Sequence, residues 1–239
     1  MSGKLILAGT GIGGLKRMTM EVHDHLHSAM RIFHLTSLHD HLSRNYTADI
    51  VDLASVYHTA KSKTEAYSTI TKTLLDAVMN GQDQDNIVFL TYGHPLFLVN
   101  SSLDLMACVD CTILPALSAF DTLLIDSPVS LSNGAQLFET TKFVALRQRP
   151  AAFDPVVLFQ FGDYASQDTK GTPNIARLKL LKQHLLRDFP ASHKLYVVVS
   201  SWDDGISRQI VSLRLENLDE RHDAVIPGAT MIMPPVREV

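Results

Sequence analysis

Cysteine is scarce in this chain of 239 residues, which contains only Cys108 and Cys111. Two cysteines exclude a disulfide-rich secreted scaffold, and a single C-x-x-C pair supplies only half of a four-thiolate zinc site. A thioredoxin-like redox pair would open a helix after a strand. This pair instead precedes the apolar segment TILPAL, where a helix is expected to give way to a strand. We therefore predict two reduced cysteines with a structural role.

An excess of one charge and a long apolar run are also lacking. The net charge is -4, with 19% charged and 46% hydrophobic residues, which is ordinary for a soluble globular protein. Such a chain has no electrostatic reason to bind nucleic acid or anionic lipid, and no apolar run is long enough to span a bilayer. The N-terminal run reaches a glycine turn after about five residues, too few for a signal peptide. We expect a cytoplasmic protein without a nucleic-acid or membrane partner.

The apolar patterning predicts an α/β protein. Strands and helices alternate in the first half, which favours a mainly parallel sheet with helices on its faces and ligands beyond the carboxyl ends of the strands. The predicted strands there are 4–8, 31–35, 50–53, 86–90 and 112–114, and the helices are 19–27, 63–78 and 98–107. The second half, with more hairpin content, has predicted strands at 156–161, 195–200, 208–215 and 229–233 and a helix at 175–189. We predict two α/β domains, 1–117 and 118–239.

A glycine-rich turn follows the first strand. Residues 9–14 read GTGIGG and fit G-x-G-x-x-G, the turn that approaches the pyrophosphate of a dinucleotide. A dinucleotide site would also place a carboxylate at the end of the second strand, where this chain has His34 and Leu35. The dinucleotide interpretation is therefore disfavoured. A tight turn without a ligand and a turn lining a cofactor without a pyrophosphate both remain open.

Three segments together resemble a known family. The segment KLILAGTGIGGLKRMT resembles the opening strand and glycine loop of the tetrapyrrole (corrin/porphyrin) methylase superfamily. IVFLTYGHPLFLV and ILPALSAFDTLLID are similar to its second and third blocks, in the same order and at similar spacing. This resemblance implies a methyltransferase that binds S-adenosylmethionine in the cleft between two α/β domains and releases S-adenosylhomocysteine. It also implies a homodimer.

Finer features resemble one branch, the borosin peptide backbone N-methyltransferases. The segments NGAQLFETT (133–141), LFQFG (158–162) and IMPP (232–235) are similar to that branch, and His94 replaces the aspartate of most tetrapyrrole enzymes. Borosin enzymes methylate backbone amides of a ribosomal peptide that is fused to the enzyme or supplied separately. Because the sequence stops almost at Pro235, we expect a stand-alone enzyme acting in trans on a separate peptide.

The resemblance also implies site residues. Tyr57, Lys63 and Tyr67 match the tyrosine, arginine and tyrosine that line the borosin site, with lysine in place of the arginine, and Tyr92 is a fourth candidate. A peptide nitrogen is a poor nucleophile, because its lone pair is delocalised into the carbonyl group. A tyrosine base and a cation or hydroxyl near the oxygen would provide the required catalysis.

The implied cofactor contacts come from both halves of the chain. Those expected at the methionine end and ribose are Tyr92, Gly93, His94, Pro95, Phe97, Ser118 and Ala119. Gln160, Ser200 and Thr230 are expected near the adenine, while His94 could instead serve to orient the substrate or only to shape its turn. No metal site is predicted, since His23 and His27 share a helical face but lack a third ligand.

Two alternatives differ from peptide methylation. One is a C-methyltransferase for a tetrapyrrole precursor, against which His94 argues. The other is a non-catalytic S-adenosylmethionine-binding partner or regulator, which the replacement of arginine by Lys63 keeps open.

Overall fold

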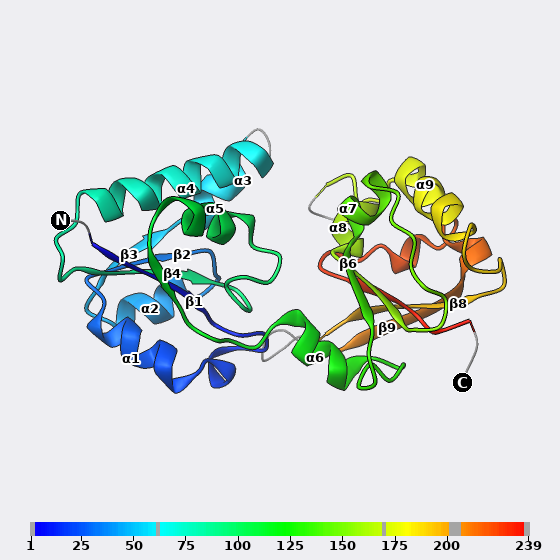
Figure 1. Ribbon diagram of the computed structural model, residues 1–239, viewed down its shortest axis with the longest axis horizontal. Helices are drawn as coiled ribbons and strands as arrows, with labels where there is room; N and C mark the ends of the chain where they lie inside the picture. The colour runs from blue at the N-terminus through cyan, green and yellow to red at the C-terminus, as the bar shows by residue number, and fades with distance from the viewer. Residues whose placement is uncertain (1–2, 61–62, 169–170, 201–206, 237–239) are drawn as a thin grey trace. The chain divides into compact units, whose positions relative to one another are not determined.

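The chain forms two compact units, the first ending at Phe120 and the second beginning at Asp121 (Figure 1). The computed structural model describes residues 3–60, 63–168, 171–200 and 207–236, and for residues 57, 58, 63 and 64 it describes the backbone only. Within these ranges, every helix is too short or too polar to cross a membrane. Each unit is built on its own five-stranded sheet, so the predicted α/β class with two domains is confirmed.

The first sheet is entirely parallel, with the strand order β3-β2-β4-β1-β5. Its central strands β1 and β4 are buried almost throughout, because helices cover both faces, and this explains their continuous apolar runs. The strands are β1 (Lys4–Gly9), β2 (Arg31–His34), β3 (Asp49–Asp52), β4 (Asn86–Thr91) and β5 (Cys111–Ile113).

Two helical layers enclose this sheet (Figure 1). Residues of β1 alternate between the layers, with Ile6 in the core under α1 and α2, and Leu5 in the core under α4 and α5. Thr19 begins α1 by accepting a hydrogen bond from the Val22 amide at 3.3 Å. The helices are η1 (Leu15–Arg17), α1 (Met20–Ser28), α2 (His39–Asn45), α3 (Ala54–Thr59), α4 (Lys63–Met79) and α5 (Asn100–Cys108).

The second sheet is mixed, with the order β6-β7-β10-β8-β9. Only β6 and β7 run parallel, and the remaining neighbours are antiparallel, which confirms the greater hairpin content. The strands are β6 (Gln136–Glu139), β7 (Val156–Phe159), β8 (Lys194–Val199), β9 (Gln209–Arg214) and β10 (Thr230–Met233). The helices are α6 (Ala119–Asp126), which contains the boundary between the units, α7 (Thr140–Ala145), α8 (Phe161–Ala165), α9 (Ile175–Leu185), η2 (Leu215–Asn217) and η3 (His222–Ala224).

Several predicted element ends differ from the structure by one to four residues, and three of them have a local cause. The strand predicted at 156–161 ends at Phe159, because Gln160 has a left-handed backbone (φ 56°) and precedes α8. The helix predicted at 175–189 ends at Leu185, and the chain continues in turns towards Pro190. The strand predicted at 50–53 ends at Asp52, since the next residue caps α3.

The cysteines lie where the sequence placed them. Cys108 ends α5, Cys111 begins β5, and both thiols are free. Burial raises the pKa of the Cys111 thiol, and the nearby Asp110 carboxylate raises it further. A thiol with a raised pKa is a poor nucleophile, in agreement with a structural role.

His193 makes the stability of the second unit depend on pH. Its Nε2 lies 3.0 Å from the carbonyl oxygen of Pro234, to which it donates, and its ring contacts Phe189. Burial lowers the pKa of His193 below its ordinary value of 6.5, although this hydrogen bond opposes the shift. As the pH falls below 6.5, the unfolded chain takes up a proton that the folded chain does not. The contribution of His193 is therefore complete above that pH and is lost as the pH falls through the lowered folded value.

We expect His193→Gln to flatten this pH dependence, since glutamine keeps a hydrogen-bond donor but does not titrate. Urea unfolding of both proteins between about pH 5 and pH 8 measures the slopes. His25→Ala is the control, because it removes an imidazole from the first unit and leaves His193 unchanged. Equal slopes in His193→Gln and the wild type would contradict the assignment.

Candidate functional site

The loops after β1, β4 and β5 meet at the carboxyl edge of the first sheet. Gly11 and Gly93 form an isolated antiparallel bridge, in which the Gly93 amide donates to the Gly11 carbonyl at 3.2 Å. A methyl group on Gly9 would lie 1.9 Å from the carbonyl oxygen of Gly93 and 3.0 Å from Cβ of Ala116. Glycine is therefore required at position 9 by backbone contact between two turns, without any pyrophosphate. The three segments that carry the family resemblance form one connected structure.

The residue at the end of β2 gives no support to a dinucleotide site. It is His34, which is fully buried and accepts a hydrogen bond at Nδ1 from the Thr36 amide at 3.4 Å. Burial lowers the pKa of His34, although the Asp52 carboxylate opposes this shift. A ribose-binding carboxylate is thus replaced here by a buried imidazole that is neutral at physiological pH.

A pocket of about 330 Å³ opens at the same carboxyl edge. Two of its residues are predicted catalytic tyrosines, Tyr67 from α4 and Tyr92 from the turn after β4. The complete lining is Leu35, Ala54, Tyr67, Thr91, Tyr92, Leu98 and Val99. Polar hydroxyls in a largely apolar concavity are typical of a site that orients a small ligand or substrate segment. The structure thus brings together two tyrosines that are far apart in the sequence.

The turn that follows β4 is held by its own hydrogen bonds. The Leu96 amide donates to Nδ1 of His94 at 3.1 Å, and the Phe97 amide donates to the His94 carbonyl at 3.0 Å. Of the two roles left open for His94, these contacts support shaping of the turn. Leu98 follows with a left-handed backbone (φ 64°), which costs about 1–3 kcal/mol in a non-glycine residue. Backbone strain is therefore located in the wall of the pocket.

Four further site candidates also belong to the first unit. Tyr57 belongs to α3 and Lys63 is the first residue of α4, but their side chains lie outside the described part of the structure. Ala119 is the first residue of α6 and Ser118 directly precedes it, with the Ser118 hydroxyl accepting a hydrogen bond from the Phe120 amide at 3.2 Å. Their roles stay predictions.

The three residues expected near the adenine share one edge of the second sheet. Gln160 follows β7, Ser200 follows β8, and Thr230 begins β10. Because β10 is antiparallel to both neighbours, its start lies beside their ends, with Thr230 opposite Val198. The fold therefore places Gln160, Ser200 and Thr230 along one edge of this sheet, while contact with adenine stays a prediction.

Five pocket residues were not predicted from the sequence. Leu35 directly follows β2, Ala54 lies just beyond the end of β3 as the first residue of α3, and Thr91 is the last residue of β4. Leu98 and Val99 continue the turn that contains the predicted Tyr92. Their position in the sequence could have identified them, since residues at the carboxyl ends of parallel strands line ligand sites. Their small or apolar side chains carry no chemical signal of their own.

Comparisons with known proteins identify relatives of the sequence. Residues 4–204 match the family model of Tetrapyrrole (Corrin/Porphyrin) Methylases. The chain is 29% identical over 202 residues to the methyltransferase/ribosomally synthesized cyclic peptide lentinulin A precursor of Lentinula edodes, covering 80% of this chain and 48% of that protein. It is 27% identical over 202 residues to the corresponding omphalotin A precursor of Omphalotus olearius, with the same coverage. The chain thus spans about half the length of these curated relatives.

Solved structures agree with the fold. The uroporphyrin-III-C-methyltransferase from Thermus thermophilus superposes with a TM-score of 0.69 at 19% identity, covering 98% of this chain and 95% of that one. A uroporphyrin-III C-methyltransferase structure from the same organism, complexed with S-adenyl homocysteine, gives a TM-score of 0.64 at 16% identity, covering 98% of both chains. At these identities the likeness establishes a common two-domain fold.

Proposed function

Because the chain belongs to the tetrapyrrole (corrin/porphyrin) methylase family, we propose that it transfers the methyl group of S-adenosylmethionine to a backbone amide nitrogen of a peptide. It is an S-adenosylmethionine-dependent methyltransferase whose second product is S-adenosylhomocysteine. The observation that supports a peptide acceptor is the pocket shared by Tyr67 and Tyr92, in a chain whose curated relatives are named as methyltransferases and cyclic peptide precursors.

The proposed cofactor contacts lie at the carboxyl edge of the first sheet and at the edge of the second sheet where β10 begins. The turn from Tyr92 to Phe97, together with Ser118 and Ala119, binds the methionine end and the ribose. Gln160, Ser200 and Thr230 bind the adenine. Backbone groups carry much of this recognition, because the turn is fixed by the Gly11–Gly93 bridge and therefore presents its remaining groups with little loss of conformational entropy.

The reaction must overcome the low nucleophilicity of an amide. The nitrogen forms a bond to the methyl carbon while the bond between that carbon and sulfur breaks. The electron pair of the broken bond stays on sulfur, which becomes a neutral thioether. The amide proton passes to the phenolate oxygen of Tyr67, the proposed base, which has to be ionised before it can accept the proton. The charge that develops on the carbonyl oxygen is stabilised by the Tyr92 hydroxyl and by Lys63. Lysine supplies the charge without the two-donor fork of arginine.

A second candidate acceptor is a tetrapyrrole precursor, methylated on carbon. It is favoured by the extent of the structural match to the Thermus thermophilus enzyme, which covers nearly the whole chain. The peptide stays the leading proposal, because the curated relatives are named as methyltransferases and cyclic peptide precursors.

We expect the purified chain to add methyl groups one at a time to a separately supplied peptide. The assay uses synthetic peptides that copy the precursor segment of the Lentinula edodes relative, with uroporphyrinogen III in parallel reactions. Intact mass follows the number of methyl groups, and fragmentation distinguishes backbone nitrogen from side chains. Calorimetry with S-adenosylmethionine and S-adenosylhomocysteine measures binding of the cofactor independently of the acceptor.

The possible results separate the candidates. Methylation of uroporphyrinogen III alone would refute a peptide acceptor. Cofactor binding with no methylation of either acceptor would favour the regulator. Failure to bind either form of the cofactor would exclude all three. A homodimer and a cytoplasmic location stay predictions, and light scattering of the purified chain tests the first of them.

A further inference from the structure

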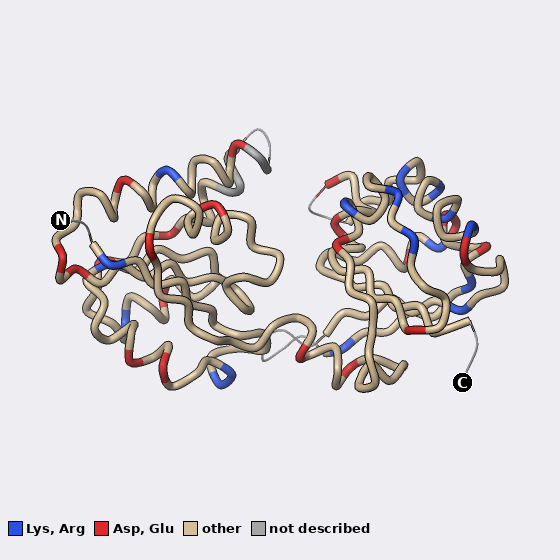
Figure 2. The backbone as a smooth tube through the Cα atoms, viewed as in Figure 1, with Lys and Arg blue, Asp and Glu red and all other residues tan. Residues whose placement is uncertain are grey.

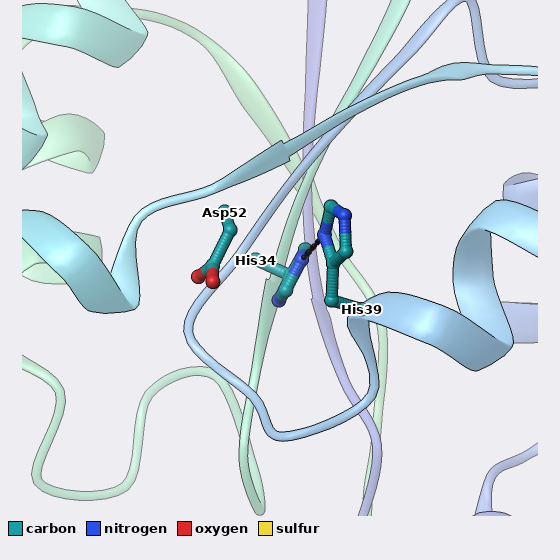
Figure 3. A group of neighbouring side chains, drawn as sticks. All are labelled: His34, His39 and Asp52. Atoms are coloured by element: carbon teal, nitrogen blue, oxygen red, sulfur yellow. Dashed lines mark hydrogen bonds between the residues drawn. The ribbon is translucent and has the colours of Figure 1, made fainter.

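Two histidines and one carboxylate gather at the edge of the first sheet (Figure 3). His34 is the last residue of β2, Asp52 is the last residue of β3, and His39 is the first residue of α2. His34 and Asp52 are register partners in the parallel pair of strands. One potential ligand atom from each side chain lies within 4.8 Å of the others. None of the three has a part in the proposed methyl transfer.

The spacing of the two imidazoles suits a shared metal ion. Nε2 of His34 lies 3.1 Å from Nδ1 of His39. Zinc binds imidazole nitrogens at about 2.0–2.1 Å in tetrahedral geometry, which places two such nitrogens about 3.4 Å apart. An ion can therefore replace the proton between the rings with only a small movement of His39. Asp52 is exposed, so a change of its rotamer can bring a carboxylate oxygen to the same ion.

Neighbouring hydrogen bonds hold these ligands in place. On the far side of the His34 ring, Nδ1 accepts from the Thr36 amide while Nε2 carries the ring proton, and it lies 3.3 Å from the Thr36 hydroxyl. When Nε2 binds a metal, the ring proton moves to Nδ1, which then donates to that hydroxyl in place of the hydrogen bond from the amide. That hydroxyl also accepts a hydrogen bond from the Leu38 amide at 3.3 Å and so fixes the turn that delivers His39. Asp52 Oδ1 accepts from the Ala54 amide at 2.7 Å, which leaves Oδ2 for an ion.

We propose that His34, His39 and Asp52 form a binding site for a divalent transition-metal ion of the zinc class. Two neutral imidazoles and a carboxylate are ligands that zinc, cobalt and nickel accept, and water completes the coordination on the exposed side. The ion joins the edge strand β3 and helix α2 to β2. It also fixes Asp52, whose carboxylate accepts from the amide of Ala54, the first residue of α3 and part of the pocket lined by Tyr67 and Tyr92.

The test titrates Zn²⁺ into the full chain by calorimetry, after chelator treatment and removal of any histidine tag. We expect one strong site, visible d–d absorption when Co²⁺ replaces Zn²⁺, and a higher melting temperature with the metal. His39→Ala should weaken binding about tenfold or more. Asp52→Asn should do the same, because asparagine can still accept from the Ala54 amide but lacks the charge.

His25→Ala is the matched control, since it removes a histidine of the same unit from outside the cluster and should bind Zn²⁺ as the wild type does. His39 is exposed, so its replacement should leave the fold intact, and circular dichroism verifies this. Absence of a strong site in the wild type would overturn the proposal. So would wild-type affinity in both His39→Ala and Asp52→Asn. These readouts need no methyl acceptor, so they stand apart from the proposed function.

Discussion

We expect Tyr67→Phe to lower the rate of methyl transfer by about 10²–10⁴-fold, the range that one general base contributes. Tyr67 lines the pocket at the carboxyl edge of the first sheet together with Tyr92. Phenylalanine keeps the ring that fills the wall and removes only the hydroxyl. The affinity for S-adenosylmethionine should therefore stay close to that of the wild type, while kcat falls. Single-turnover mass spectrometry and calorimetry measure the two quantities separately.

Tyr46→Phe is the matched control for this experiment. Tyr46 is a buried tyrosine of the same unit, and its hydroxyl lies 2.7 Å from Nδ1 of His23, in the layer under α1 and α2. Its replacement should cost about 1 kcal/mol of stability without a comparable loss of rate. Equal rates for Tyr67→Phe and the wild type would assign Tyr67 to packing alone. A parallel loss of cofactor affinity would make it a binding residue.

The first unit could be predicted from the sequence largely because its strands are buried on both faces. Continuous apolar runs such as those in residues 4–8 and 86–90 predict central parallel strands, and the amphipathic pattern of 63–78 predicts α4. The short helices α2 and α3 were missed, since each has fewer than two full turns and little periodicity. In the second unit, the left-handed Gln160 ended a strand that its apolar composition would have continued.

The sequence predicted residues of the candidate site only where those residues belong to a family motif. Tyr67 and Tyr92 were named from the family pattern, and the parallel topology brings them to one pocket. The cluster of His34, His39 and Asp52 was missed, because strand register brings the first and last together. A search along the sequence favours pairs such as His23 and His27, which share a helix. Ligands that meet across strands require the sheet order to be known.

The partners of the charged residues could not be predicted from the sequence either. Figure 2 shows Lys and Arg gathered along α9 in the second unit, and the sequence alone reveals that helix as basic. The contacts of these residues come from the fold: Lys182 donates to Asp219 at 2.6 Å, although the two are 37 positions apart. That contact lowers the pKa of the Asp219 carboxyl, with the Lys182 hydrogen bond as the largest cause. Part of the positive charge on α9 is therefore neutralised by the ion pair between Lys182 and Asp219.

Gly9→Ala should be the most destabilising single-methyl change in the glycine turn. The added methyl group would lie 1.9 Å from the carbonyl oxygen of Gly93, a backbone atom that cannot move away by rotation. Relief requires separation of the turns after β1 and β4, with loss of the bridge between Gly11 and Gly93. We expect a loss above about 4 kcal/mol in the free energy of unfolding, the size that marks an exceptional mechanism. Cofactor affinity should fall with it, since the proposed methionine-end contacts lie in the same turn.

Gly14→Ala distinguishes this steric requirement from the ordinary cost of losing glycine. Gly14 has a positive φ of 86°, but a methyl group there would meet no atom within 4 Å, so its replacement should cost only about 1–3 kcal/mol of backbone strain. Urea unfolding compares the two variants, and a soluble yield too low to measure counts as the larger loss. If the variants proved equally stable, the contact between Gly9 and Gly93 could not be what requires glycine. The G-x-G-x-x-G pattern would then need a ligand to explain it. A larger loss at position 9 would instead establish that this pattern arises where two turns touch, whether or not a phosphate is bound.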